Sequence, residues 1–266
     1  GMLGVFTSVT MQMKKMHSGL LEVHAYPVSN LKAHLKAILD DAPQNDYTVG
    51  WLDAMAGGSG LGRGQIHAAK YLHEGDDPDG KKTMQVEYQT LPATLFGVFP
   101  KSIIHYFMTP FQFAPMWSMV NTAKYIASLR EGTYRQSHAA FHFLLDYVPN
   151  WELSAGRGGL IQYQSFLPKE TAEDAWREML SMSLKRGIPS YLGVTKRHRP
   201  DKFLLTHAVD GFSLALDFKV TKSNQDKLGK MLQEFDKIVV NAGGRFYFAK
   251  NSETSSATAL KFYGKE

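Results

Sequence analysis

The sequence of 266 residues contains no cysteine. This absence excludes disulfide frameworks, thiolate zinc sites, iron–sulfur clusters and a cysteine nucleophile. No apolar run approaches the roughly 20 residues that a membrane-spanning helix needs. The chain begins GMLGVFTSVTMQMKKM, and its lysines follow the apolar part, which is the wrong order for a signal peptide. We therefore expect a cytoplasmic protein, and peripheral contact with the inner face of a membrane is left open.

A strong charge of one sign is also lacking. The sequence has 30 Lys+Arg and 25 Asp+Glu, a net charge of +5, and the positive residues are scattered. Such a mild excess favours an anionic substrate or a lipid surface over nucleic acid. Hydrophobic residues make up 44% of the chain, which is typical of a globular protein. The length fits one large domain or two.

The glycine-rich segment 57–64 lacks the residues of a phosphate-binding loop. Gly57 and Gly62 have the required spacing, but Arg63 and Gly64 stand where Lys and Ser/Thr are needed. A dinucleotide fingerprint fails too, because Gln65 stands where the third glycine is required. We therefore expect a tightly turning surface loop.

Apart from one pair, the histidines are scattered along the sequence. His138 and His142 are four residues apart, a spacing that would place both on one side of a helix. No Glu follows His138, and we expect an extended conformation over 139–145, in which the two rings are about 13 Å apart. The sequence therefore predicts no metal site.

Alternating and helical patterns predict an α+β fold with a mainly antiparallel sheet and helices on one face. Expected helices begin after a cap at Ser29 or Asn30, near residue 115, after a capping box at Thr171-x-x-Asp174, and after a cap at Ser223. We expect irregular connections over 92–117. Strands are predicted at 8–14, 20–26, 47–54, 160–167, 190–196, 212–218 and 245–248.

The C-terminal half has the order strand–helix–strand–strand–helix–strand, which is that of a ferredoxin-like β-α-β-β-α-β unit. The strand, helix and strand at 20–54 are a candidate for a partial second copy, although no sequence repeat supports it.

Two groups of polar residues are candidates for ligand contacts. Gln162 and Gln164 share one face of a strand with apolar neighbours, where they serve either a ligand or the adjacent backbone. The stretch Lys196-Arg197-His198-Arg199 is either a solvated hairpin tip or a grip on an anionic head group. The pattern alone leaves both alternatives open.

Several stretches together resemble the FAD-linked oxidases of the vanillyl-alcohol-oxidase type: YTVGWLDAMA, REGTYR, VPNWELSAGRGGLIQYQSFLP, GFSLALDF and AGGRFYFAKNS. The likeness is greatest to the branch of decaprenylphosphoryl-β-D-ribose 2′-oxidases, and aldonolactone oxidases are more distant. It covers nearly the whole chain. The resemblance implies that 1–18 is the last strand of a missing FAD-binding domain, and that 19–266 is the substrate (cap) domain.

The resemblance also implies an activity. The complete enzyme would oxidise a sugar-type secondary alcohol, a lipid-linked sugar, by hydride transfer to FAD. Lys250 and Tyr247 would be the catalytic and cofactor-binding residues that face flavin and substrate. The implied substrate-binding residues are Trp51, Gln162, Gln164, Lys196 and Ser213.

Departures from the family pattern leave the sugar open. Ser213 stands where this branch can carry Asn, and Ala215 where it can carry Cys. Phe143 stands at the place of a pocket tyrosine, and Ala155 at the place of an aromatic residue.

Alternatives to the sugar oxidase are a D-arabinono-1,4-lactone-type oxidase domain and a truncated, non-catalytic binding module. The expected partners are an FAD-binding domain or subunit, the sugar substrate, and a second copy that covers an exposed apolar sheet face. The chain alone is expected to hold FAD poorly and to be inactive. Whether it is an excised domain, a split subunit or a truncated gene product is left open, as is the electron acceptor.

Overall fold

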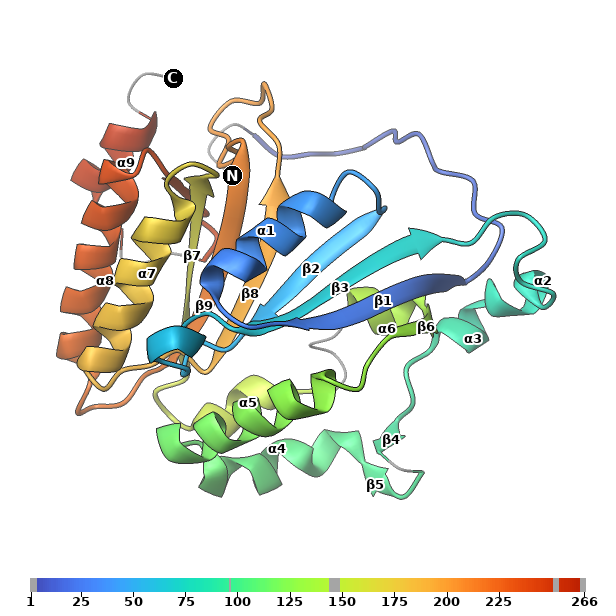
Figure 1. The fold of residues 1–266 in the computed structure, drawn as a ribbon, viewed down its shortest axis with the longest axis horizontal. Coiled ribbons are helices and arrows are strands. Elements are labelled where there is room, and N and C mark those ends of the chain that lie inside the picture. Colours follow the sequence, from blue (N-terminus) through green and yellow to red (C-terminus); the bar gives the residue numbers. More distant parts are fainter. Residues whose placement is uncertain (1–3, 96, 144–148, 251–253, 264–266) are drawn as a thin grey trace.

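The computed structural model describes residues 4–95, 97–143, 149–250 and 254–263. An eight-stranded sheet runs through the molecule in the order β10-β7-β9-β8-β2-β3-β1-β6, and every neighbouring pair is antiparallel (Figure 1). The predicted α+β class with a mainly antiparallel sheet is thus confirmed. The strands are β1 (Leu20–Val28), β2 (Tyr47–Leu52), β3 (Gly64–Tyr71), β6 (Thr133–Ser137), β7 (Leu160–Pro168), β8 (Leu192–His198), β9 (Gly211–Lys219) and β10 (Arg245–Phe246).

Three helices cover one face of this sheet: α1 (Leu31–Asp41), α7 (Ala172–Lys185) and α8 (Gln225–Asn241) (Figure 1). Alternate residues of β9 point toward them and are buried in the main core, as the period-two pattern predicts: Phe212, Leu214, Leu216 and Phe218. Helix α1 begins at the predicted cap, where the Asn30 side chain accepts a hydrogen bond from the Ala33 backbone N–H at 2.9 Å.

The two halves of the chain have the same strand order. The C-terminal half runs β7-α7-β8-β9-α8-β10 and forms the sheet order β10-β7-β9-β8. The N-terminal half forms β6-β1-β3-β2, and the halves join where β2 pairs with β8. The C-terminal half therefore has the predicted order of elements, and the second copy reaches beyond 20–54. It includes β3, which the sequence analysis misses because β3 is buried on both faces and shows no alternation.

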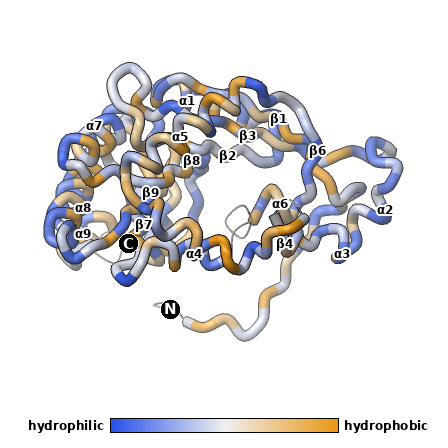
Figure 2. The backbone as a smooth tube through the Cα atoms, turned by 90° about the horizontal axis from the view of Figure 1, so that it is seen from below, coloured by the Kyte–Doolittle hydropathy of each residue, from blue (hydrophilic) through white to orange (hydrophobic). Residues whose placement is uncertain are grey.

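Helix α5 (Ala114–Ser128) crosses the other face of the sheet. Asn121 donates a hydrogen bond to the buried Asp53 at 3.1 Å, and the Lys124 ammonium lies 4.3 Å from the centre of the Trp51 ring. Figure 2 shows that hydrophobic residues gather around α4, where Tyr106 and Phe107 are exposed. The connection between β3 and α5 contains α2 (Gly80–Thr83), α3 (Val86–Gln89), β4 (Thr94–Leu95), β5 (Phe99–Pro100), α4 (Ile104–Met108) and short 3₁₀ turns.

The strand predicted at 8–14 is wrong. Residues 4–19 form no strand, and Val9, Met11 and Met13 are 64%, 70% and 80% exposed. A strand needs a neighbour to accept its backbone hydrogen bonds, and none of the described strands pairs with this segment. Its origin as the last strand of an FAD-binding domain stays a prediction.

The extended conformation predicted for 139–145 is also wrong over its described part. Residues His138–His142 form helix α6, because the Ser137 hydroxyl caps the backbone N–H of Ala140 at 3.3 Å. Residues 144–145 lie outside the described part of the chain.

Two predicted helix caps are absent. Thr171 precedes α7, but its hydroxyl donates to the backbone oxygen of Ala242 at 2.8 Å and does not cap the helix. Helix α8 has Asn224 as its N-cap residue, one position after the predicted Ser223. The remaining elements of the described residues are the 3₁₀ turns at Gly58–Gly60 and Trp151–Ala155 and helix α9 (Ser256–Tyr263). Among the described helices, none has both the length and the apolar character needed to cross a bilayer.

Candidate functional site

Strand pairing aligns several predicted site residues in rows on the sheet face opposite α1, α7 and α8, which we call the polar face. Residues paired directly across neighbouring strands point to the same side of a sheet. The central row crosses five strands through Gln164, Ala215, Val194, Trp51 and Gln65. The predicted Gln164 and Trp51 therefore lie on the same face.

Two more rows lie on either side of the central one. One of them crosses five strands through Phe166, Ser213, Lys196, Val49 and His67. The other consists of Gln162, Asp217 and Leu192. All five predicted substrate-binding residues thus lie on the polar face.

Tyr247 and Lys250 lie just beyond β10, beside β7. The Tyr247 backbone N–H donates to the Gln164 carbonyl at 3.5 Å, and its ring lies 5.0 Å from that of His207. The Lys250 backbone N–H donates to the Tyr247 carbonyl at 2.9 Å. The positive charge of Lys250 opposes part of the rise in the pKa of Asp217 that burial causes. The predicted pair therefore lies next to the amide end of the polar face.

Asp217 is one of the polar residues on this face, with Gln65 and His67, that the sequence patterns did not identify as site residues. It is 4% exposed, and its Oδ1 accepts a hydrogen bond from Gln162 Nε2 at 2.7 Å. Burial raises the pKa of Asp217 to about 6, although the hydrogen bond from Gln162 and the charge of Lys250 oppose the shift. The signal was available, because Asp217 is four residues after Ser213 in a strand and shares its face.

Ser213 and Trp51 both have partners within the fold. Ser213 is buried, and its hydroxyl lies 2.8 Å from His198 Nε2. Trp51 is buried under the Lys124 ammonium. Beside it, burial and the charge of Lys124 lower the pKa of His67 to about 4. His67 is therefore neutral at physiological pH, and burial also lowers the pKa of Lys124.

The basic stretch 196–199 is divided between the two faces. Lys196 is exposed on the polar face, where burial and, to a lesser degree, the charge of Lys196 lower the pKa of His142. Arg197 points to the other side, donates to the Gly211 carbonyl at 2.7 Å and forms an ion pair with Asp210. The stretch therefore does not form a single anion-binding site. Lys196 is the residue of this stretch that is best placed to contact a ligand on the polar face.

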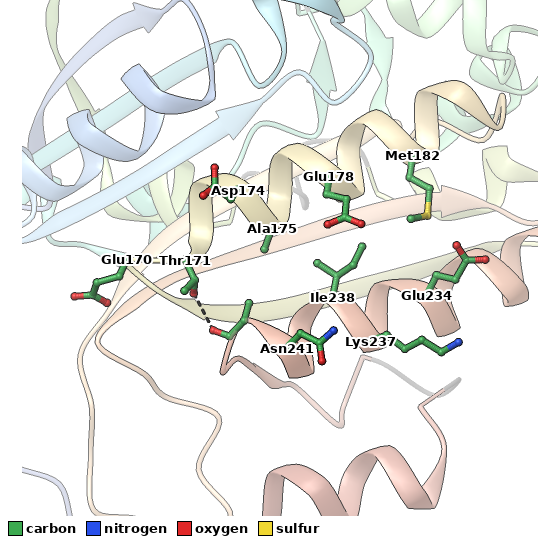
Figure 3. Close-up of a pocket in the computed structure, with 11 residues that line it drawn as sticks. Glu170, Thr171, Asp174, Ala175, Glu178, Met182, Glu234, Lys237, Ile238 and Asn241 are labelled. Atoms are coloured by element: carbon green, nitrogen blue, oxygen red, sulfur yellow. Dashed lines mark hydrogen bonds between the residues drawn. The ribbon is translucent and has the colours of Figure 1, made fainter.

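A surface pocket of about 640 Å³ lies away from the polar face, between α7 and α8 (Figure 3). Carboxylates of Glu170, Asp174, Glu178 and Glu234 line it, and Lys237 is among their neighbours. None of the predicted site residues lines this pocket. In the described part of the chain, no group of three or more His, Asp or Glu side chains is arranged to hold a metal ion.

The chain is 24% identical over 273 residues to decaprenylphosphoryl-β-D-ribose oxidase of Mycolicibacterium smegmatis. The match covers 99% of this chain and 55% of the relative, so the chain spans about half the relative's length. A solved structure titled Physcomitrella patens BBE-like 1 wild-type aligns over 93% of this chain and 48% of its own, with 9% identity. Its TM-score of 0.44 is too low to establish a shared fold. No family model matches the chain. The match agrees with the resemblance found in the sequence: over nearly its whole length, the chain is similar to about half of a decaprenylphosphoryl-β-D-ribose oxidase.

Proposed function

We propose that this chain is the substrate-binding part of an FAD-dependent oxidoreductase that oxidises a sugar-type secondary alcohol, a lipid-linked sugar, by hydride transfer to flavin. The polar face carries this proposal. It sets amide, hydroxyl, ammonium and carboxyl groups in three adjacent rows of a sheet, next to Tyr247 and Lys250. The name of the mycobacterial relative describes an oxidase of a substrate in this class.

The groups on the polar face suit a phosphorylated sugar. The amides of Gln162 and Gln164 can both donate to and accept from sugar hydroxyls, and the Ser213 hydroxyl lies one row further along. The Trp51 ring offers an apolar wall in the central row. The exposed Lys196 ammonium suits a phosphate group. These residues would bind and orient the substrate.

The residues beyond β10 fit the ring part of FAD. Lys250 is exposed, its backbone is hydrogen-bonded to that of Tyr247, and an ammonium and a phenol are groups that can face the polar edge of an isoalloxazine ring. When bound, FAD supplies the hydride acceptor. The Lys250 ammonium would balance negative charge on the reduced ring or on the substrate oxygen.

The nucleotide part of FAD needs another binding site. The 3₁₀ turn at Gly58–Gly60 has three residues, and the segment around it lacks the lysine and hydroxyl of a phosphate loop. We therefore assign nucleotide binding to an FAD-binding domain or subunit that pairs with this chain. On its own, the chain should hold FAD poorly and be inactive. A stoichiometric flavin spectrum in the purified chain would contradict this division.

An aldonolactone oxidase is the second candidate, and a non-catalytic binding module is the third. Lys196 favours the phosphorylated substrate, because a lactone has no anionic group to meet it. To separate the three, the chain would be combined with the FAD-binding part of the mycobacterial relative, produced separately. Flavin reduction would be followed without oxygen, using a ribosyl phospholipid or D-arabinono-1,4-lactone as substrate. Reduction by the phospholipid is expected. Reduction by the lactone alone would identify the second candidate, and a flavin-loaded complex that neither substrate reduces would identify the binding module.

Self-association and membrane contact belong to the same proposal. Without its partner domain the chain exposes apolar side chains, including Phe107 and Phe111, and is expected to form a homodimer. Light scattering that gives a strict monomer at high concentration would contradict the dimer.

Peripheral contact with a membrane is tested by sedimentation with anionic vesicles. A chain that stays in the supernatant would contradict this contact.

A further inference from the structure

We propose that Asp217 accepts the hydroxyl proton when the substrate alcohol is oxidised, a role that rests on the proposed function. In this step the carbon–hydrogen bond breaks, and the hydrogen leaves with both electrons as hydride to the flavin. The oxygen–hydrogen bond also breaks, and its electron pair forms the carbonyl bond. The proton passes to the carboxylate of Asp217, which balances the reaction.

The position of Asp217 supports this role. It lies on the polar face in one row with Gln162, and Gln162 Nε2 holds its Oδ1 at 2.7 Å. The backbone on both sides is fixed in β9, whose alternate residues Leu216 and Phe218 are buried on the helix face. A proton acceptor held in a rigid strand can keep a constant geometry toward a bound hydroxyl.

Lys250 lies near Asp217 without forming an ion pair with it. Its charge acts on Asp217, yet within the described residues no ion pair of 4.0 Å or less includes the Asp217 carboxylate. Glu152 also acts on it, with the opposite sign. A hydroxyl between Asp217 and Lys250 would have a proton acceptor on one side and a cation on the other. The cation would favour loss of the hydroxyl proton.

Comparison with two other buried carboxylates shows why Asp217 is the candidate proton acceptor. Asp53 is fully buried, but the Arg63 guanidinium pairs with it at 3.0 Å, as expected for a structural ion pair. Asp236 on α8 is 5% exposed, accepts a hydrogen bond from the Tyr163 hydroxyl at 2.9 Å, and also has a pKa raised by burial to about 6. Asp236 lies on the helix side and cannot meet a ligand on the polar face. It is therefore a matched control for Asp217.

The first test uses the full chain without flavin. Carboxyl ¹³C NMR titrations of the parent, Asp217→Asn and Asp236→Asn chains would assign both groups, and methyl β-D-ribofuranoside would serve as the alcohol probe. The probe is expected to move the Asp217 signal and its midpoint, and to leave the Asp236 signal in place. An Asp217 signal that does not respond to saturating probe would overturn the proposal.

The second test uses the flavin-loaded complex with the ribosyl phospholipid. We expect Asp217→Asn to lower kcat by about 10²–10⁴-fold, the usual contribution of a general base, and to remove the acidic limb of the pH profile. Asp236→Asn should keep the parent kcat and the acidic limb of the pH profile. Circular dichroism would confirm that each variant is folded. If the parent oxidises the lipid and Asp217→Asn does so equally well, the proposal fails and the proposed function stands. If the parent does not reduce flavin, both fail.

Discussion

Gln162 donates a hydrogen bond from Nε2 to Asp217 Oδ1 at 2.7 Å, between paired residues of the neighbouring strands β7 and β9. A neutral amide offsets only part of the cost of burying an ionised carboxylate. The fold therefore holds a destabilising charge at this place in the sheet. Local costs of this kind are typical of functional sites.

Replacing Asp217 by Asn should stabilise the chain at neutral pH. The pKa of Asp217 is about 6 in the folded chain, against an ordinary value of 3.8, so the folded state binds the proton more tightly than the unfolded state does. The stability that this proton contributes is complete below about pH 4 and is lost as the pH rises through 6. We expect Asp217→Asn to raise the free energy of unfolding at pH 7.5 by about 1–3 kcal/mol, and to change it little at pH 4. Urea unfolding at both pH values measures the difference.

Asp210→Asn is the control for this experiment. Hydrogen bonds from Lys169 and Arg197 lower the pKa of Asp210, which is the opposite direction. The variant should gain no stability at pH 7.5. An equal gain in both variants would show that the effect is one of surface charge and does not come from the burial of Asp217.

A methyl group at Gly50 should destabilise the junction between the two halves of the sheet. An added Cβ would overlap the Thr195 hydroxyl and the His34 ring, which contact each other at 2.7 Å inside the core. We expect Gly50→Ala to cost about 1–3 kcal/mol. Gly229→Ala in α8 meets no atom within 4 Å and should stabilise the chain by about 0.5–1 kcal/mol. Thermal unfolding of both variants would contradict this account if they shift Tm in the same direction.

Substitution of Lys196 should change ligand affinity, whereas substitution of Arg197 should change stability. Lys196→Met removes an exposed cation from the polar face and should weaken binding of a ribosyl phospholipid, with little effect on the lactone and on stability. Arg197→Met breaks the ion pair with Asp210 and the hydrogen bond to Gly211, so it should lower Tm and leave affinity nearly unchanged. Calorimetric titration of each variant with the phospholipid and with the lactone measures the affinities, and thermal unfolding measures the change in Tm. Equal loss of affinity for both ligands in Lys196→Met would contradict a phosphate contact.

The first 13 residues should contribute little to the stability of this chain. Val9 and its apolar neighbours are exposed and belong to no strand, whereas Ser18 is buried, bonded to Asp77, and accepts a hydrogen bond from the Leu20 N–H at 2.9 Å. Deleting residues 1–13 should change the free energy of unfolding by less than about 0.5 kcal/mol. Ser18→Ala should cost about 1–3 kcal/mol, because it leaves buried polar groups unsatisfied. Chemical denaturation compares the two, and a large loss in the deletion variant would contradict the prediction.

Sequence patterns predicted most elements that have an apolar side and a polar side. The period of β9 places Phe212 and Phe218 in the core, and Asn30 marks the start of α1. Strand β3 was missed because it is buried on both faces, and 8–14 was wrongly predicted because alternation does not supply a pairing partner. The short helix at 138–142 begins at the Ser137 cap, and its five residues are too few to show a helical period in the sequence.

By itself, the sequence determined the fold class, the two-sided pattern of most strands, and the candidate residues for the proposed site. Only the tertiary structure decided which residues of different strands lie side by side on one face of the sheet. Strand order and register brought Gln164 and Trp51 into one row although they are far apart in the chain. They also paired Arg197 with Phe212 and buried Asp217 beside Gln162. The physical reason is that alternation fixes which side of its own strand a residue faces, whereas the residues it meets depend on pairing between distant segments.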